Sequence, residues 1–231
     1  MRLDKYLSNA GIASRSIIKS FLKDKRVTVN NVLILHGKVQ INPDSDIIKV
    51  DDKIIAYKPF RYFVLNKPQG YVSANEDNRY PTVMSFFTDI KIKGLAHVGR
   101  LDLDTTGVLL ITNDGKLAHH LIAPKANVNK IYEVTVDKDL NNNLIESFAL
   151  GITLENGEIC KPAKLEIISN RQARLYLTEG KYHQVKRMMR QSGYNVIKLH
   201  RSAFAFLTTK NLKPGEYYEL NDEEIQKLKE Y

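Results

Sequence analysis

Two aspartates separated by a single residue, Asp102 and Asp104, are the side chains of this sequence best suited to chemistry. They lie in the polar stretch HVGRLDLDTTG (97–107), which we predict to be a loop leading into a strand over 108–112. Loops of this kind often carry functional groups. In an extended stretch both carboxylates point to one side, as paired glycosidase acids or metal ligands do. The alternative is a turn in which both aspartates accept local backbone hydrogen bonds.

The motifs of most other classes of enzyme are absent from this sequence. His119 and His120 are adjacent, so on a helix they face different directions, and the spacing of a histidine–acid zinc motif is absent. Neither GxxxxGK[ST] nor GxGxxG occurs, nor does a serine or cysteine hydrolase signature. Cys160 is the single cysteine, which excludes a disulfide framework and a cysteine-rich zinc site. One further hypothesis is an aspartate that acts on a nucleic acid with basic and aromatic residues from elsewhere in the chain.

Basic residues are concentrated in two zones. The chain has 35 lysines and arginines against 26 acids, a formal charge of +9. Residues 1–40 hold eight basic residues and two aspartates, whereas residues 180–201 hold six and no acid. Such an excess is typical of proteins that bind polyanions. The two zones predict two contact surfaces for one nucleic acid, and the alternative for either zone is a solvated face.

Length and composition predict two modest domains in an ordinary globular protein. The 231 residues exceed a typical domain, and the contents of hydrophobic and charged residues, 43% and 26%, are those of folded proteins. No apolar run approaches the roughly 18 residues of a membrane span. The charged N-terminus differs from a signal peptide. With a single cysteine, these features predict a cytoplasmic protein without a membrane partner.

Periodicity predicts a small basic helix-turn-helix at the N-terminus. Leu3 and Leu7 mark a first helix that ends at Gly11, and Ser14 can cap a second helix. The second helix has an apolar stripe formed by Ile17, Ile18, Phe21 and Leu22. Its other face carries Arg15, Lys19 and Lys23. Short strands follow, with a tight turn at 30–31.

After residue 61 the pattern changes to strands with interspersed helices. Apolar or alternating runs predict strands at 63–66, 108–112, 130–136 and 174–178, and helical spacing predicts helices between 115 and 124 and within 182–193. Because the two types do not alternate strictly, we predict an α+β fold with a mixed, mainly antiparallel sheet. The expected domains are 1–57 and 62–231, joined by a linker at 58–61 in which Pro59 bars regular structure.

Four motifs resemble, in the expected order, those of the RsuA branch of RNA pseudouridine synthases. They are GRLDLDTTG (99–107) followed by VLLITNDG (108–115), KIYEV (130–134), EGKYHQVKRM (179–188) and VIKLHR (196–201). Residues 1 to about 55 resemble an S4 RNA-binding module. The resemblance covers nearly the whole chain. It implies an S4 domain before a pseudouridine synthase domain that isomerises uridine in RNA.

The resemblance also implies roles for single residues. Asp102 matches the catalytic aspartate, Tyr132 the tyrosine that lies against the target base, and Lys186 the basic residue that pairs with the aspartate. Leu199 matches an apolar position that walls the base pocket. Many pseudouridine synthases outside this subgroup have arginine at the position of Lys186. The neighbouring Arg187 therefore remains an alternative partner of the aspartate and a candidate for substrate binding.

Further residues are expected to hold the RNA. Arg100 lies beside the catalytic aspartate, where it can fill the space left by an extruded base or clamp a phosphate. The S4 resemblance implies phosphate contacts by Arg2, Lys5, Arg15 and Arg26, and the basic helix face adds Lys19 and Lys23. No metal or cofactor is implied, because the isomerisation needs neither a redox step nor an external group.

Within the branch, Thr105 and Thr106 resemble the Thr-Thr pair of enzymes that modify the small-subunit 16S rRNA, and the chain lacks the long basic tail of some large-subunit relatives. We therefore expect a monomer that acts on ribosomal RNA or on a small-subunit assembly intermediate. The alternatives are a large-subunit 23S rRNA synthase of the same branch, a noncatalytic S4-type RNA-binding protein, and a carboxylate-pair glycosidase, which the net charge disfavours. Sequence alone leaves open which uridine is modified and whether the aspartate attacks the sugar or removes a sugar proton.

Overall fold

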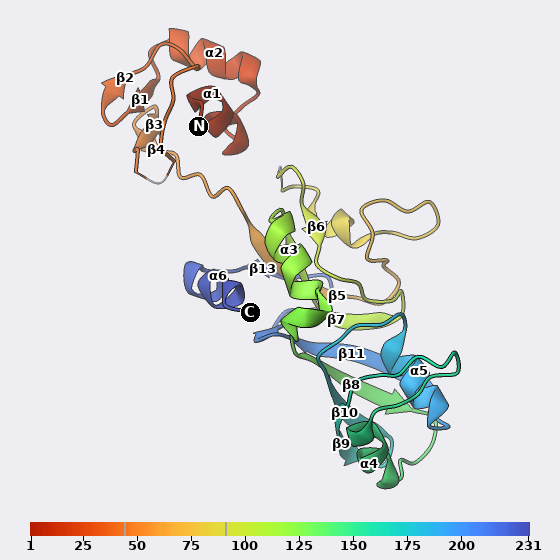
Figure 1. Ribbon diagram of the computed structural model, residues 1–231. Helices are drawn as coiled ribbons and strands as arrows, with labels where there is room; N and C mark the ends of the chain where they lie inside the picture. The colour runs from red at the N-terminus through yellow and green to blue at the C-terminus, as the bar shows by residue number, and fades with distance from the viewer. Residues whose placement is uncertain (44, 91) are drawn as a thin grey trace. The chain divides into compact units, whose positions relative to one another are not determined.

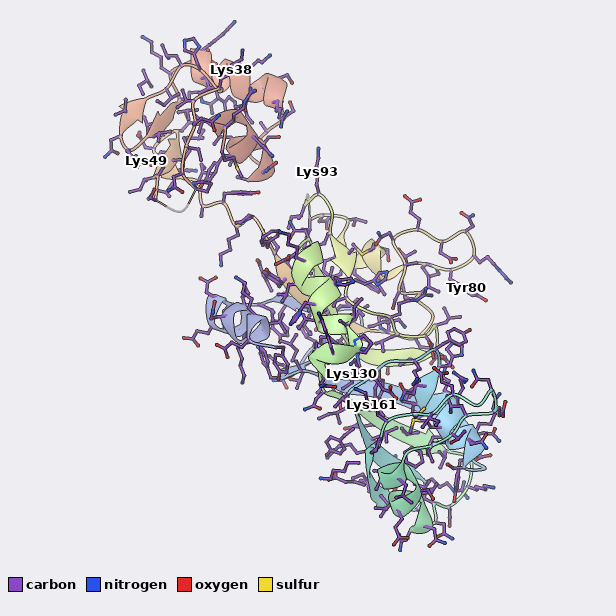
Figure 2. All side chains as sticks on the ribbon, viewed as in Figure 1. Lys38, Lys49, Tyr80, Lys93, Lys130 and Lys161 are labelled. Atoms are coloured by element: carbon purple, nitrogen blue, oxygen red, sulfur yellow. The ribbon has the colours of Figure 1, made fainter. Side chains whose placement is uncertain are left out.

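The computed structural model describes residues 1–43, 45–90 and 92–231. It divides the chain into two compact units (Figure 1). The first unit comprises Met1–Phe60 and Ile90–Lys93, and the second comprises Arg61–Asp89 and Gly94–Tyr231. Figure 2 draws the side chains, with Lys38 and Lys49 labelled in the first unit and Lys130 and Lys161 in the second. Among the described residues, no helix combines the length and the apolar character that crossing a membrane requires.

The first unit pairs two helices with a small antiparallel sheet. Its elements are α1 (Leu3–Asn9), α2 (Arg15–Lys23), β1 (Val27–Val29), β2 (Val32–Leu33), β3 (Ile48–Val50) and β4 (Lys53–Ile54), with strand order β2-β1-β3-β4. Gly11, with φ +75°, follows α1, and the Ser14 hydroxyl accepts a hydrogen bond from the backbone of Ile17 at the start of α2. Asn30 and Asn31 both have positive φ in the turn between β1 and β2. Both predicted helices and the predicted turn are confirmed.

The apolar stripe of α2 is narrower than its sequence predicts. Ile18 and Leu22 are buried in the core of the first unit, together with Leu3 and Leu7 of α1. Ile17 is instead 49% exposed, so its assignment to the core face was wrong. The small sheet covers only part of the helix surface, and a residue one step along the helix from Ile18 points about 100° away from it.

The second unit is built on a nine-stranded mixed sheet, counted over the described residues. Its main order is β13-β5-β7-β11-β8-β10-β9, with β6 on β7 and β12 on β11. The strands are β5 (Tyr62–Lys67), β6 (Ala96–His97), β7 (Thr105–Thr112), β8 (Lys130–Val136), β9 (Lys164–Ser169), β10 (Gln172–Leu177), β11 (Val196–Phe204), β12 (Leu207–Thr208) and β13 (Tyr217–Glu219). Strands β7 and β11 run parallel, and the other pairs are antiparallel. The predicted α+β fold with a mixed, mainly antiparallel sheet is confirmed.

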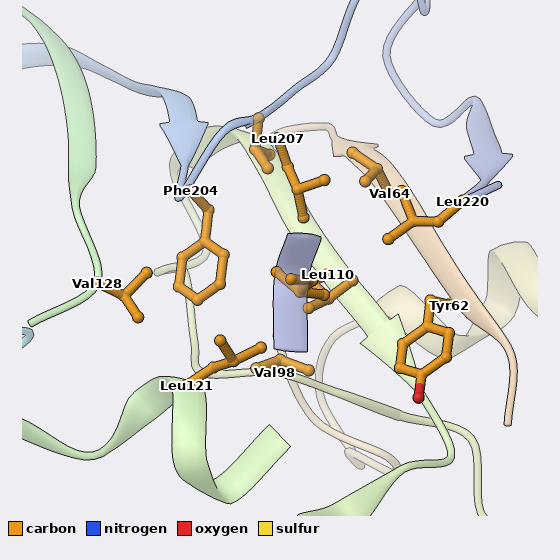
Figure 3. Close-up of a cluster of buried hydrophobic side chains, with 11 residues drawn as sticks. Tyr62, Val64, Val98, Leu110, Leu121, Val128, Phe204, Leu207 and Leu220 are labelled. Atoms are coloured by element: carbon orange, nitrogen blue, oxygen red, sulfur yellow. The ribbon is translucent and has the colours of Figure 1, made fainter. Parts of the chain in front are cut away.

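Six helical segments accompany this sheet in the second unit, counted over the described residues. They are η1 (Val83–Phe87), α3 (Gly115–Ile122), η2 (Pro124–Ala126), α4 (Asn143–Leu150), α5 (Gln184–Gln191) and α6 (Asp222–Lys229). Leu121 of α3 and Leu228 of α6 are buried against alternate residues of β5 and β7, among them Val64 and Leu110 (Figure 3). Burying these side chains is the main force that holds both helices on one face of the sheet.

The parallel pairing of β7 with β11 joins two of the sequence motifs. Leu199 lies opposite Thr105, and Arg201 lies opposite Gly107. A Cβ atom on Gly107 would come within 2.2 Å of the carbonyl oxygen of Arg201, and its φ is +106°, so only glycine fits at this close approach. The pairing also lengthens β7. The predicted loop 97–107 therefore ends earlier, because strand β7 begins at Thr105.

Candidate active site

A cavity of about 560 Å³ lies in the second unit near the beginning of β7. Its wall is formed mainly by the loop before β7, by β8 and β11, and by the turn before α5. These segments belong to four motifs that are far apart in the sequence. The fold therefore brings all four motifs to one site.

The carboxylate of Asp102, in the cavity wall, is held on both of its oxygens. Lys186 Nζ lies 3.0 Å from Oδ2, and His183 Nε2 lies 3.3 Å from Oδ1. The Asp102 side chain is 27% exposed. Sequence analysis missed His183, although the motif EGKYHQVKRM contains it, because only the basic residue that pairs with the aspartate was considered there.

The second aspartate binds the same lysine. Asp104 Oδ1 lies 2.5 Å from Lys186 Nζ, but this side chain is 57% exposed. Burial acts to lower the pKa of Lys186, but hydrogen bonds from its ammonium to Asp104 and Asp102 outweigh burial and raise the pKa above its usual value. Burial would raise the pKa of Asp104, and the hydrogen bond from Lys186 outweighs it and lowers that pKa. Both carboxylates therefore bind the same cation. This arrangement does not suit a carboxylate-pair glycosidase, in which one of the two groups must stay protonated.

A buried lysine binds backbone carbonyl groups at the end of the loop before β7. Lys67, at the end of β5, is 0% exposed and donates hydrogen bonds to the carbonyl oxygens of Pro68, Asp102 and Thr105, at 3.1, 3.0 and 2.7 Å. Burial lowers the pKa of Lys67 to about 8. The Ser73 hydroxyl also bonds the backbone N–H and carbonyl of Leu101. Sequence analysis missed Lys67, whose signal is a charged residue that ends an apolar strand.

The predicted wall residues surround the same space. Tyr132 of β8 and Leu199 of β11 are 9% and 7% exposed and line the cavity. Tyr132 shares the buried face of β8 with Val134 and Val136, as the alternation of that strand predicts. Arg100 also lines the cavity and remains exposed. The structure thus brings these three side chains together around Asp102.

Arg187 is directed elsewhere. Its Nη1 lies 3.1 Å from Glu158 Oε2, and its Nη2 donates to the side-chain oxygen of Asn156 at 2.8 Å. Arg187 is not among the described residues that line the cavity. In the structure the cation that contacts Asp102 is therefore Lys186.

Two more cations line the cavity and were missed from the sequence. Lys130 (labelled in Figure 2) is 8% exposed, and burial lowers its pKa to about 8. Arg201 is 2% exposed and donates from Nε to the carbonyl of Val108 at 2.8 Å. Its Nη2 has no hydrogen-bond partner among the described residues. The cavity wall therefore carries positive charge at Lys130 and Arg201, in addition to Arg100.

The basic residues expected to bind RNA in the first unit are largely on its surface. Arg2, Lys5, Arg15, Lys19 and Lys23 are exposed, and Arg26 is half-buried. Arg2 pairs with Asp4 and Arg26 with Asp51, each at 2.5 Å. Within the described residues, no group of three or more histidine, cysteine, aspartate or glutamate side chains is arranged to hold a metal ion.

Comparisons with known proteins agree with the motifs. The sequence profile of RNA pseudouridylate synthases matches residues 61–191, and that of the S4 domain matches residues 1–33. The ribosomal small subunit pseudouridine synthase A of Yersinia pestis is 40% identical over 97% of this chain and 97% of its own. The protein of that name from Escherichia coli K12 is 39% identical over 97% and 98%. An uncharacterized RNA pseudouridine synthase of Bacillus subtilis, YtzG, is 40% identical over 100% and 99%.

A solved structure agrees with the whole fold. A crystal structure described as that of a pseudouridylate synthase is 39% identical, covers 99% of each chain and superposes with a TM-score of 0.70. The resemblance expected from the motifs is thereby confirmed. From its profile match over 61–191 and its full-length relatives, this chain belongs to the RNA pseudouridylate synthase family and carries an N-terminal S4 domain.

Proposed function

We propose that this protein isomerises a uridine of the small-subunit 16S rRNA to pseudouridine. The observation that carries the proposal is the carboxylate of Asp102 in a cavity, held by Lys186 and His183, in a chain of this family. Relatives that match over nearly the full length are named ribosomal small subunit pseudouridine synthases, which supports the choice of the small-subunit RNA.

Isomerisation breaks the bond between the ribose and N1 of the uracil, turns the detached base, and joins its C5 to the same sugar carbon. The hydrogen on C5 leaves as a proton and the freed N1 takes up a proton, so the product is an isomer and no oxidant, reductant or external group takes part. In our proposal Asp102 is the reacting carboxylate. Lys186 lies 3.0 Å from Oδ2 and fixes the direction of the carboxylate, because opposite charges attract at this distance. Oδ1, on the side of the cavity-lining His183, then faces the substrate.

The target base must leave the RNA stack to reach this carboxylate, at a cost of a few kcal/mol. A cavity of about 560 Å³ is in the range of sites that bind small molecules. We propose that Tyr132 contacts the extruded base, that Leu199 forms an apolar wall beside it, and that Arg100 clamps a phosphate or fills the vacated position. The cationic side chains of Lys130 and Arg201 offer further donors to the nucleotide.

We further propose that the protein acts as a monomer in the cytoplasm, on ribosomal RNA or on a small-subunit assembly intermediate. The domains in this proposal are 1–57, which docks the RNA, and 62–231, which carries out the reaction, with a linker at 58–61. The exposed basic side chains of the first unit support the docking role, because lysine and arginine bind phosphates and release counterions.

Mapping pseudouridines in ribosomal RNA from cells that lack this protein tests the proposed function. We expect one pseudouridine of the 16S rRNA to disappear and to return when the wild-type gene is restored. Restoring the Asp102→Asn variant provides the control for catalysis. An unchanged 16S rRNA would contradict the proposal, and a loss confined to 23S rRNA would favour the large-subunit alternative.

Replacing Arg15, Lys19 and Lys23 of α2 with glutamine should weaken RNA binding and make it less dependent on salt. Each lost phosphate contact lowers the slope of log affinity against log salt by about 0.9 on duplex or about 0.7 on single-stranded RNA. We therefore expect the slope to fall by about 2 to 3 units, while the single-turnover rate at saturating RNA stays near the wild-type rate. Binding titrations over a series of salt concentrations measure this slope for the wild-type protein and for the variant.

A matched control replaces three other exposed lysines, Lys164, Lys213 and Lys229, with glutamine. This variant changes the net charge by the same amount but leaves α2 intact. If both triple variants showed the same slope, the effect would come from total charge, and the docking role of α2 would be rejected.

A further inference from the structure

One aromatic side chain of the cavity wall has no part in the chemistry proposed above. Tyr182 lines the cavity and yet is 77% exposed. Its ring stacks on the ring of His183, with centroids 3.9 Å apart and planes 16° from parallel. His183 in turn contacts Oδ1 of Asp102. Tyr182 is thus the outer member of a stack that ends at the carboxylate.

The turn that presents this ring is held in place by several interactions. His183 has φ 48°, a left-handed conformation that is costly for a residue with a side chain. The side chain of Gln184 is 4% exposed, accepts a hydrogen bond from the backbone of Lys181 at 2.9 Å and donates one to Glu179 at 2.7 Å. Arg187 also donates to the carbonyl oxygen of Tyr182 at 3.3 Å. These interactions within the turn therefore hold the Tyr182 ring in its exposed position.

The chemistry of the ring and its surroundings suits an RNA base. An exposed aromatic face stacks on unpaired bases, and every base has such a face. When a uridine is extruded into the cavity, the base beside it loses a stacking partner at the same place. Arg100 is exposed in the wall of the same cavity, so a cation is available there for a phosphate of the same strand. One face of the Tyr182 ring is taken by His183, which leaves the other for a base.

We propose that Tyr182, backed by His183, is the stacking surface for the base next to the extruded uridine. This inference rests on the proposed function and adds a second aromatic contact to it. Tyr132 contacts the target base within the cavity, whereas Tyr182 contacts its neighbour at the outer wall. Every base can stack on an aromatic ring, so Tyr182 does not select the identity of the flanking base. The contact requires only that a base is present there.

A double-mutant cycle between protein and RNA tests this contact. The protein is the full chain with Asp102→Asn, so that binding is measured without turnover, and the RNA is a fragment of the 16S rRNA centred on the mapped uridine. Tyr182→Ala should weaken binding about tenfold, and an abasic nucleotide at one flanking position should do the same. Together the two changes should weaken binding no more than either alone, because both remove the same contact.

Two controls separate stacking from other effects. Tyr182→Phe keeps the ring and should bind like the parent protein. A 2-aminopurine at the same flanking position should be quenched by the parent and by Tyr182→Phe, but not by Tyr182→Ala. If the losses of binding free energy caused by Tyr182→Ala and by the abasic nucleotide were additive at both flanking positions, the stacking role would be rejected. It would also be rejected if Tyr182→Phe bound the RNA as weakly as Tyr182→Ala.

Activity measurements on protein with an intact Asp102 distinguish a failure of this inference from a failure of the proposed function. Tyr182→Ala should raise KM about tenfold and leave the single-turnover rate at saturating RNA within about twofold of wild type. If the wild-type protein formed no pseudouridine in the fragment, the proposed function would fail. If pseudouridine formed but the cycle energies were additive, only the role of Tyr182 would be rejected.

Discussion

Asp102→Asn should reduce pseudouridine formation by at least about 10³-fold while RNA affinity stays within about twofold of wild type. Asparagine has nearly the size of aspartate but lacks the carboxylate charge, which either attack on the sugar or removal of a sugar proton would use. The fold should persist, because Lys186 keeps its ion pair with Asp104 and is not left as an unpaired cation. Tritium release from RNA labelled at uridine C5 measures the reaction, and thermal unfolding measures the stability.

The matched variant is Asp104→Asn. Asp104 binds the same lysine but is 57% exposed and is not among the described residues that line the cavity. We expect its activity to stay within about tenfold of wild type, because exposed ion pairs contribute little. Tritium release at nearly the wild-type rate by the Asp102 variant would show that another group reacts with the substrate. Absence of tritium release by the wild-type protein would instead favour the hypothesis of a noncatalytic RNA-binding protein.

Lys186→Gln should slow the single-turnover reaction about 10²-fold to 10³-fold at saturating RNA. Glutamine can still donate a hydrogen bond to Asp102, but it cannot supply the positive charge that fixes the direction of the carboxylate in a partly buried site. Lys186→Arg restores the charge and should recover part of the rate. A Lys186→Arg variant no faster than Lys186→Gln would show that the positive charge at this position is not the cause of the loss.

Arg187→Gln is the control for this variant because it removes the same charge from the next residue. Arg187 binds Glu158, Asn156 and the carbonyl oxygen of Tyr182 but does not contact Asp102, and glutamine can still donate a hydrogen bond, so this change should leave the rate within about threefold of wild type. Its ion pair with Glu158 is partly exposed, and we expect its loss to change the stability little. Equal losses of rate in both variants would contradict the assignment of Lys186 as the partner of Asp102.

Local sequence determined much of the fold. Ser14 at the start of α2, Asp114 at the start of α3, and the asparagine pair 30–31 act within a few residues of the chain, so their effects could be predicted without knowledge of the tertiary structure. The alternation of β8 correctly placed Tyr132 on a buried face, because the side chains of a strand alternate between two faces. The order of the four motifs identified the family.

The pairing of charges was decided only by the tertiary structure. Lys186 and Arg187 are adjacent basic residues on α5, and their directions differ by about 100° around the helix axis. The packing of α5 on the sheet sets which of them faces the loop before β7 and which faces Glu158. The burial of Lys67 and the contact of His183 with Asp102 likewise depend on segments far apart in the sequence. Periodicity reports only which residues share a face of one element, whereas a site of this kind is formed where several elements meet.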